Sequence, residues 1–252
     1  MKLLNLIIIR YYKSEEYMII PEYFFNEHSI CIFTDASYRR NRDYKHGDTS
    51  RGTTAPAAMV YHRYDLIDQD FNILHNTTSQ VGELHAVLLG VMLAYKYRNY
   101  RVRLFSDSQN SIFAIRDRIF KWVRSQEAGN NVLGDDGSLK NQEDIMQIVY
   151  YIISNNFPME FYHVKGHVYD YYDYDHAQEV FKYSNGYDID LKTTQLLGIY
   201  NNRVDEFSTA MLRRYENSKK YNTKGFKVPI TIGYAPFDMG NYFNLVNCKD
   251  RN

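Results

Sequence analysis

Residues 29–37 read SICIFTDAS, a run of β-favouring residues that ends in an aspartate, a small residue and a serine. Its apolar part is nearly continuous, which is typical of a strand buried on both faces of a sheet. Residues 101–108 read RVRLFSDS and repeat the arrangement, with Asp107 where the first run has Asp35. Parallel strands end at the same edge of a sheet, where open α/β sheets bind their ligands. We therefore predict that Asp35 and Asp107 lie close together at that edge.

The rest of the chain supplies three more strands and the helices between them. Strands are expected at 57–63, 69–75 and 159–164, with a polar turn at 64–68. Helical spacing of apolar residues predicts four helices: one after cap candidates at 77–79, one through Ile112 and Val123, one over 141–155 and one over 202–215. The order β, β, β, α, β, α, α, β, α predicts one α/β domain, with a five-stranded mixed sheet and helices on both faces.

The predicted domain occupies residues 29–216 and is flanked by two extensions. Residues 1–28 form an N-terminal extension, and residues 217–252 form a tail that is first basic and then loop-like. Residues 168–200 are rich in Tyr and Asp with weak periodicity, so we expect an insertion before the last helix. The apolar stretch near the N-terminus is short and lacks a small-residue cleavage site, which favours an extension over a targeting signal.

Composition restricts the class of protein. Of the 252 residues, 44% are hydrophobic, which is ample for a packed core and excludes a disordered chain. No apolar run reaches about 18 residues, so no membrane span is expected. Two cysteines cannot form a disulfide framework, so we expect a reducing, intracellular and cytoplasmic setting.

Formal net charge is zero, with 30 Lys and Arg against 30 Asp and Glu. Any contact with nucleic acid must therefore come from local basic patches. The candidates are the Arg-rich loop 38–54, the tail lysines, and Arg116, Arg118, Lys121 and Arg124. For each of them, a solvated charged surface is an equally good explanation.

Four carboxylates stand out by their positions beside buried segments. Asp35 and Asp107 follow strands, whereas Glu83 and Asp205 adjoin apolar helix faces. Each alone has an ordinary explanation as a turn residue, a helix cap or a boundary residue pointing to solvent. Together at one sheet edge they would repel one another unless cations neutralised them. Two Mg²⁺ ions about 3.5–4 Å apart would do so and would clamp both reacting oxygens of a phosphodiester. Oxygen ligands suit such hard cations, with Mn²⁺ as a substitute.

Six segments, in this order along the chain, resemble the sequence blocks of type 1 ribonuclease H. They are IFTDAS at 32–37, TSQVGEL at 78–84, LFSDSQ at 104–109, KNQE at 140–143, HVKGH at 163–167 and NNRVDEF at 201–207. The resemblance covers residues 29–215. Each segment is weakly specific alone, but the ordered set is strongly specific.

The resemblance implies a fold, a reaction and a set of site residues. The fold is the ribonuclease H-like fold, and the reaction is two-metal-ion hydrolysis of the RNA strand of an RNA–DNA hybrid, leaving 5′-phosphate and 3′-hydroxyl ends. Asp35 would bridge both ions, and Asp205 would lie toward the ion that activates water. Glu83 and Asp107 would lie toward the other ion. His167, on a loop that contains a glycine, would assist proton transfer or product release. The implied substrate contacts are Ser37, Ser79, Gln80, Gln109 and Asn201, and the expected state is a monomer.

Three departures from the family pattern stand out, of which the first is small and the other two bear on the substrate. Ala36 stands where the family usually has Gly. Ser79 and Gln80 stand where it commonly has two Asn that contact the hybrid, so recognition of the RNA 2′-hydroxyl is open. The insertion 168–200 replaces a connection of a few residues. Its excess of acidic residues would repel a duplex unless it folds away, whereas its tyrosines could stack on unpaired bases.

Two alternatives are left open by these residues, and a zinc site is disfavoured. A nuclease of the same fold could act on DNA or on structured nucleic acid. A non-catalytic module could bind nucleic acid, but it would be expected to lose carboxylates, and all four positions remain acidic. His163 and His167 stand at zinc-like spacing, yet on a strand and a loop they would not share a face, and no cysteine is near. We predict that His163 is an ordinary strand residue.

Overall fold

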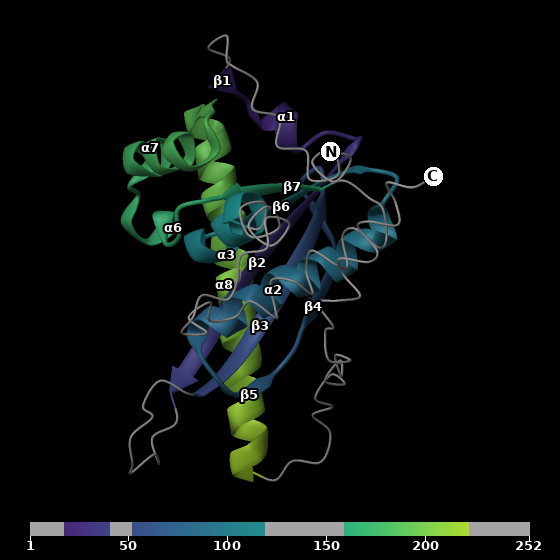
Figure 1. The fold of residues 1–252 in the computed structure, drawn as a ribbon, viewed down its shortest axis with the longest axis vertical. Helices are drawn as coiled ribbons and strands as arrows, with labels where there is room; N and C mark the ends of the chain where they lie inside the picture. The colour runs from purple at the N-terminus through teal and green to yellow at the C-terminus, as the bar shows by residue number, and fades with distance from the viewer. Residues whose placement is uncertain (1–17, 41–51, 119–158, 222–252) are drawn as a thin grey trace, which may run out of the picture.

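A computed structural model describes residues 18–40, 52–118 and 159–221, and its centre is a six-stranded mixed sheet (Figure 1). The strands follow the order β4-β3-β2-β6-β7, and β5 pairs with another part of β3. Their bounds are β2 Ser29–Arg40, β3 Gly52–His62, β4 Asp65–Phe71, β5 Leu74–Thr77, β6 Arg101–Ser106 and β7 Met159–His163. The predicted mixed α/β sheet is confirmed, with one strand more than the five expected.

The register of the central strands brings two aspartates together. β2 and β6 are parallel, and Thr34 pairs with Ser106 directly before Asp35 and Asp107. β7 is parallel to β6, whereas β3 is antiparallel to β2. The two aspartates therefore lie at the same level of neighbouring strands, as predicted.

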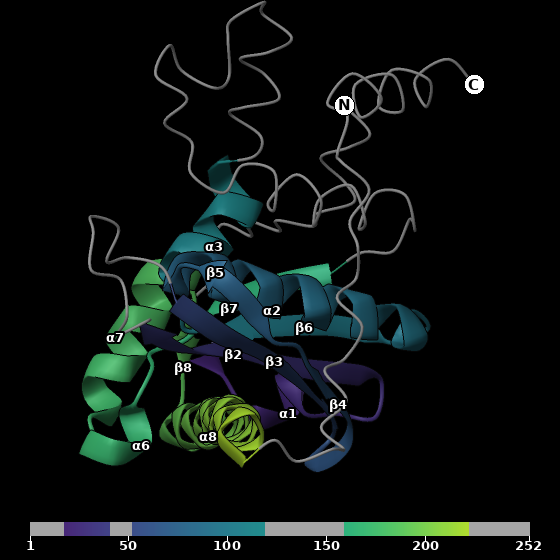
Figure 2. The same ribbon diagram turned by 90° about the horizontal axis from the view of Figure 1, so that it is seen from below.

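Helices cover both faces of the sheet, also as predicted (Figure 2). On one face lie α2, Ser79–Ala94, and α3, Gln109–Phe113, and on the other lies α8, Leu191–Tyr221. Successive residues of β2 alternate between two apolar cores. Ile32 packs with residues of α2, and Phe33 packs with residues of α8. This alternation explains why the strand is apolar on both faces.

Helix α2 begins where the sequence predicted. Thr78 has extended backbone, and its side-chain oxygen accepts a hydrogen bond from the Val81 N–H (3.3 Å), which is an N-cap arrangement. The helix ends in a 3-10 turn, η2, at Tyr95–Tyr97. After α3 the chain makes a π-helical turn, η3, at Ala114–Arg118.

β2 is longer than predicted. The sequence placed its end at residue 34, but the strand continues to Arg40, so Asp35 lies within a strand. Pairing with β3 continues from Asp35 opposite Ala57 to Arg40 opposite Gly52 after β6 has ended. The antiparallel partner keeps this backbone extended, which a pattern of apolar residues could not reveal.

The hairpin between β3 and β4 is tighter than predicted. Residues 64–68 were expected to form a turn, but β4 already begins at Asp65. Arg63 adopts a left-handed conformation (φ 55°) and allows the chain to reverse within two residues. β4 is an edge strand, so its polar side chains remain exposed, which made the segment look like a loop.

Much of the insertion 168–200 is helical. It contains α6 Val168–Tyr171, α7 Tyr174–Asn185, the short strand β8 Asp188–Ile189 and the first turns of α8. The last helix therefore begins at Leu191 and not near residue 202 as predicted. Asp190 caps this start, because the Thr193 N–H donates to Asp190 Oδ1 (2.7 Å).

Residues from the predicted N-terminal extension pack into the core on the α8 side. β1, Met18–Ile19, pairs in parallel with β8, and α1, Pro21–Phe24, follows it. Phe24 is fully buried and makes edge-to-face contacts with Phe105 (5.1 Å) and Tyr162 (5.2 Å) between ring centroids. This short segment therefore joins the insertion to the sheet.

Several predictions fall outside the described residues. They include the apolar stretch near the N-terminus, most of the Arg-rich loop, the helix predicted at 141–155 and the end of the tail. Among the helices that the structure describes, none combines the length and the apolar character needed to cross a membrane.

Candidate active site

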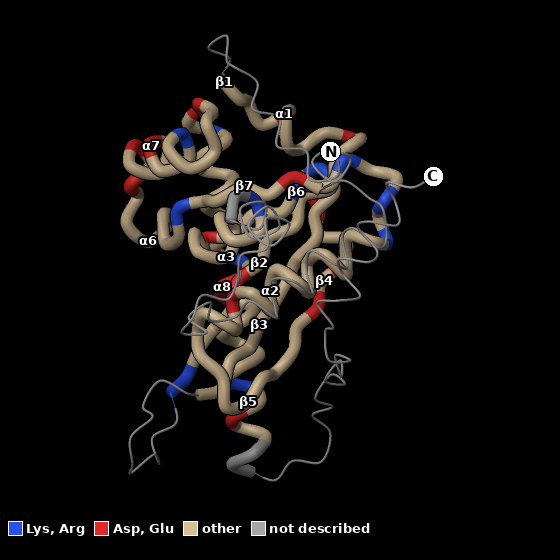
Figure 3. The backbone as a smooth tube through the Cα atoms, in the orientation of Figure 1, with Lys and Arg blue, Asp and Glu red and all other residues tan. Residues whose placement is uncertain are grey.

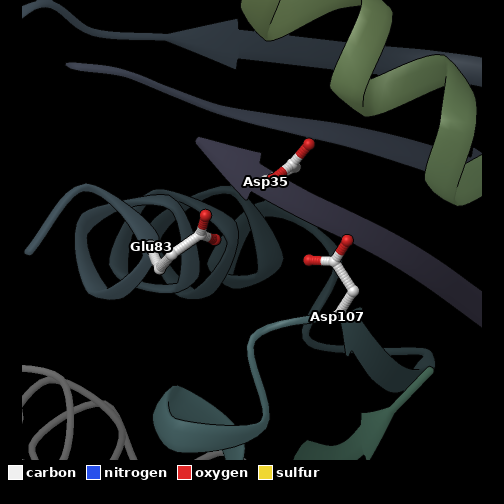
Figure 4. A group of neighbouring side chains, drawn as sticks. All are labelled: Asp35, Glu83 and Asp107. Carbon is white, nitrogen blue, oxygen red and sulfur yellow. The ribbon is translucent and has the colours of Figure 1, made fainter. Parts of the chain in front are cut away.

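Three carboxylates from three elements surround one space (Figure 4). Asp35 comes from β2, Glu83 from the first turns of α2, and Asp107 from the residue after β6. One oxygen of each lies within 4.8 Å of an oxygen of the others. The structure thus brings together three of the four carboxylates that the sequence singled out as metal ligands.

Burial and mutual repulsion oppose ionisation of these groups. The pKa values of Asp35 and Glu83 lie well above the ordinary range, first because the side chains are buried and then because neighbouring carboxylates repel a further negative charge. Burial also raises the pKa of Asp107, although a hydrogen bond from Asn201 acts in the opposite direction. A cation bound here would relieve both effects.

Asp205, the fourth predicted ligand, lies on α8 and is not among the three carboxylates that converge within 4.8 Å. Its charge raises the pKa of Asp35, after the larger effects of burial and of Asp107, so the two carboxylates are close neighbours. Thr209 lies one helical turn further and its hydroxyl donates to Asp205 Oδ1 (3.5 Å). The same hydroxyl lies 2.5 Å from Ser37 Oγ on β2. These contacts connect the helix that carries Asp205 to the strand that carries Asp35. Figure 3 shows acidic positions, in red, where β2, α2 and α8 come together.

The loop after β7 lies directly against Asp107. A Cβ atom at Gly166 would stand 2.4 Å from Asp107 Oδ2, so a larger residue here would displace either the carboxylate or the loop. His167 follows, exposed, with left-handed backbone (φ 56°) at the start of α6. Among the groups around Asp107, His167 acts to lower the pKa of this carboxyl, against the larger effect of burial.

His163 is the last residue of β7, so it is a strand residue as predicted, but its imidazole has a further role that the sequence did not reveal. It is 7% exposed, its Nε2 donates to the carbonyl oxygen of Asp107 (3.2 Å), and its Nδ1 accepts from Ser184 Oγ (2.8 Å). Burial lowers its pKa to about 4, so the ring is neutral at pH 7. Because both ring nitrogens are engaged, His163 is not available to join His167 in a zinc site. A polar residue ending a strand beside a candidate site was the only sequence signal for this role.

A family model described as RNase H matches residues 27–178, which is more than half of the chain. The chain belongs to the ribonuclease H family. The resemblance seen in the sequence and the fold it implied are confirmed, and membership indicates a hydrolase that acts on nucleic acid. The match ends before α8, so Asn201 and Asp205, which α8 carries, lie outside the matched residues. No curated protein matches the sequence.

Solved structures of ribonuclease H domains resemble the chain at low identity. The prototype foamy virus protease–reverse transcriptase is 17% identical over 69% of this chain and 22% of its own, with a TM-score of 0.45. The PFV RNase H domain is 18% identical over 62% of this chain and 94% of its own (TM-score 0.42). RNase H1 from the halophilic archaeon Halobacterium salinarum is 11% identical over 54% and 86% (TM-score 0.33). The chain thus spans 22% of the length of the foamy virus protease–reverse transcriptase.

Three of the residues predicted to contact substrate lie on the surface. Ser79 and Gln80 are exposed in the first turn of α2, the helix that carries Glu83. Gln109 is exposed at the start of α3, and its N–H donates to the Asp107 carbonyl oxygen (3.0 Å). All three residues are exposed, and they lie within four residues of Glu83 or Asp107 along the chain.

The other two predicted contacts hold the site together. The N–H of Ser37 donates to Ser208 Oγ on α8 (3.1 Å). Asn201 is only 2% exposed, and its Nδ2 donates to Asp107 Oδ2 (3.2 Å). Both residues thus join α8 to the acidic strand ends.

The residues present fit a divalent cation. Glu83 Oε2 is buried and makes no hydrogen bond among the described residues, although an ionised carboxylate oxygen there needs a partner. The converging ligands are carboxylate oxygens, which suit Mg²⁺ and Mn²⁺ better than zinc. Among the described residues, the geometry that could hold a metal ion is found at Asp35, Glu83 and Asp107.

Proposed function

We propose that this member of the ribonuclease H family is a divalent-metal-dependent endonuclease that hydrolyses the RNA strand of RNA–DNA hybrids. The products would carry 5′-phosphate and 3′-hydroxyl ends. The observation that supports the proposal most directly is the convergence of Asp35, Glu83 and Asp107 within 4.8 Å, in a chain of this family. Repulsion among these carboxylates gives the site a preference for positive charge.

The proposed ligands of two Mg²⁺ ions, or of Mn²⁺ in their place, are Asp35, Glu83, Asp107 and Asp205. Such ions, when bound, lower the pKa of a water molecule and stabilise the charge that develops on a phosphate. The protein's part is to orient the carboxylates. Asn201 holds one oxygen of Asp107, and Thr209 donates to Asp205.

His167 is proposed to move a proton near the reacting phosphate or to assist product release. It is exposed, so it can exchange protons with solvent, and it lies close enough to influence the pKa of Asp107. Its place next to Gly166, which approaches Asp107 closely, keeps it at the rim of the acidic group.

The substrate is proposed to be a hybrid bound along the rim that Ser79, Gln80 and Gln109 form. A second candidate is a DNA or structured nucleic acid substrate for the same site, since Ser79 and Gln80 replace the two Asn residues common in the family. We further propose that the protein acts as an intracellular, cytoplasmic monomer.

The deciding experiment is cleavage of labelled RNA–DNA hybrid, duplex DNA, duplex RNA and single strands with Mg²⁺. Wild type is compared with Asp107→Asn and with Asp70→Asn, a matched change at an exposed carboxylate of β4. Hybrid cleavage that Asp107→Asn abolishes and Asp70→Asn retains would support the proposal. Cleavage of DNA alone would favour the second candidate. A folded protein that cleaves none of these substrates would refute nuclease function.

A further inference from the structure

The insertion ends beside the strand edge that supports Asp107. β7 is the last strand of the sheet, so one side of its backbone has no strand partner among the described residues. Asn185, the last residue of α7, occupies this side at His163. The His163 N–H donates to Asn185 Oδ1 (3.0 Å), and Asn185 Nδ2 donates to the His163 carbonyl oxygen (2.8 Å). One side-chain amide thus makes the pair of bonds that a neighbouring strand would make.

Ser184, the preceding residue, engages the imidazole of the same histidine. Its hydroxyl donates to His163 Nδ1 (2.8 Å), and His163 Nε2 donates to the Asp107 carbonyl oxygen (3.2 Å). A carbonyl oxygen only accepts, which assigns the ring proton to Nε2 and leaves Nδ1 to accept from the hydroxyl. A continuous chain of hydrogen bonds therefore runs from α7 to the backbone of Asp107.

Arg116 ties the segment after Asp107 to the same end of α7. Its guanidinium donates to Asn185 Oδ1 (3.1 Å) and to the Ser184 carbonyl oxygen (2.5 Å). A cation at the C-terminal end of a helix also interacts favourably with the helix dipole. The helix end is defined by Gly186, whose φ of +80° terminates α7 directly after Asn185.

The body of α7 is anchored on the sheet, so this end does not move freely. Phe181 is 1% exposed and stacks on Tyr162 of β7, with ring centroids 6.0 Å apart. Phe181 also packs against Phe24 in the core (6.2 Å). In Figure 1, α7 lies beside β7, on the side away from β2.

We propose that α7 of the insertion positions Asp107: Ser184 and Asn185 hold His163, and His163 holds the Asp107 backbone, so that the insertion sets the affinity of the site for divalent metal. This inference rests on the proposed function, because it concerns a ligand of the proposed metal site. His163, Ser184 and Asn185 are positioning residues, since none of them belongs to the acidic group itself. Removing such supporting hydrogen bonds typically lowers metal affinity by about 10–100-fold.

The test measures metal binding without substrate, by titrating Mn²⁺ into full-length protein in a calorimeter. Ser184→Ala removes the donor to the imidazole, and Tyr183→Ala is the matched control, because that neighbouring side chain is 85% exposed. His163→Phe fills the space without a donor, whereas His163→Gln restores an amide donor. We expect Ser184→Ala and His163→Phe to weaken Mn²⁺ binding at least about ten-fold. Tyr183→Ala should bind as wild type does, and His163→Gln should recover part of the loss.

Hydrogen exchange of the metal-free protein gives a second readout. The amides that follow Asp107 should exchange faster in Ser184→Ala and not in Tyr183→Ala, because the Asp107 backbone is less constrained. Folded variants with wild-type Mn²⁺ affinity would overturn the inference and leave the proposed function intact. Wild type that binds Mn²⁺ but cleaves nothing would overturn only the proposed function. Wild type that binds no divalent ion would overturn both. If His163→Phe does not fold, Ser184→Ala decides the question.

Discussion

Gly166 offers a direct test of how tightly the site is built, through the change Gly166→Ala. The new Cβ would lie 2.4 Å from Asp107 Oδ2, about 1 Å closer than the 3.4 Å at which ordinary contact begins. It would also lie 3.2 Å from Asp107 Cγ and 3.3 Å from Asp107 Cβ, so rotating the carboxylate relieves the contact with Oδ2 but leaves two tight contacts. Either the loop or the carboxylate oxygen must therefore move by roughly 1 Å. A displacement of that size at a reacting group can lower the rate about 100-fold.

The assay is kcat/KM for hybrid cleavage, together with Mn²⁺ titration and thermal unfolding. We expect kcat/KM to fall roughly 100-fold and Mn²⁺ binding to weaken, with the fold retained. Gly198→Ala is the control, because its Cβ would meet Val168 at an ordinary 3.4 Å inside α8, where Ala favours the helix by about 1 kcal/mol. Gly166→Ala protein that cleaves and binds metal as wild type does would refute the argument that this approach is sterically full.

Three further predictions concern ionisation, orientation and stability. The pKa of Glu83 is raised in the folded protein. Without metal, the folded state therefore binds more protons than the unfolded state at any pH between the ordinary carboxyl pKa and the raised value. The melting temperature of the protein in EDTA should fall as pH rises through this window. Mg²⁺ or Glu83→Gln should flatten this profile, and a melting temperature that rises with pH would contradict the argument. Thr209→Val removes the hydroxyl that donates to Asp205 and should lower kcat/KM roughly ten-fold, equivalent to about 1.4 kcal/mol. Unchanged kinetics would show that this 3.5 Å contact does not orient the Asp205 carboxylate. Glu160→Leu removes the ion-pair partner of Arg103, which is 1% exposed and lies 2.9 Å from Glu160. The free energy of unfolding, measured in urea, should fall by about 3–5 kcal/mol. A loss below about 1 kcal/mol would show that other contacts satisfy the guanidinium.

The sequence was informative wherever a residue's role depends on its own strand or helix. The apolar runs of β2 and β6 predicted their parallel pairing and therefore the meeting of Asp35 and Asp107. The cap at Thr78 predicted the start of α2 and therefore the position of Glu83. These features follow from local propensity and periodicity, which a single sequence contains.

Features that depend on a distant partner could not be predicted. The extension of β2 beyond residue 34 is stabilised by β3, and periodicity does not report such pairing. The role of His163 depends on Ser184, which lies 21 residues away along the chain. The early start of α8 had a local signal, Asp190 followed by Thr193, but the surrounding Tyr and Asp residues obscured its apolar spacing. Tertiary contacts thus decide the parts of the site that distinguish this chain from its family pattern.

The start of α8 matters because one helix delivers two functional groups at once. Asn201 and Asp205 are four residues apart, so they lie on the same face, one turn from each other. Asn201 donates to Asp107, and Asp205 lies beside Asp35, so a single helix register satisfies both ends of the acidic group. Val204 lies between these two residues along the chain and is fully buried in the core. It fixes the register, because rotating the helix by one residue would bring a polar side chain into the core. The added turns from Leu191 onward lengthen the helix without altering that face, which is how an insertion of this size is compatible with an intact site.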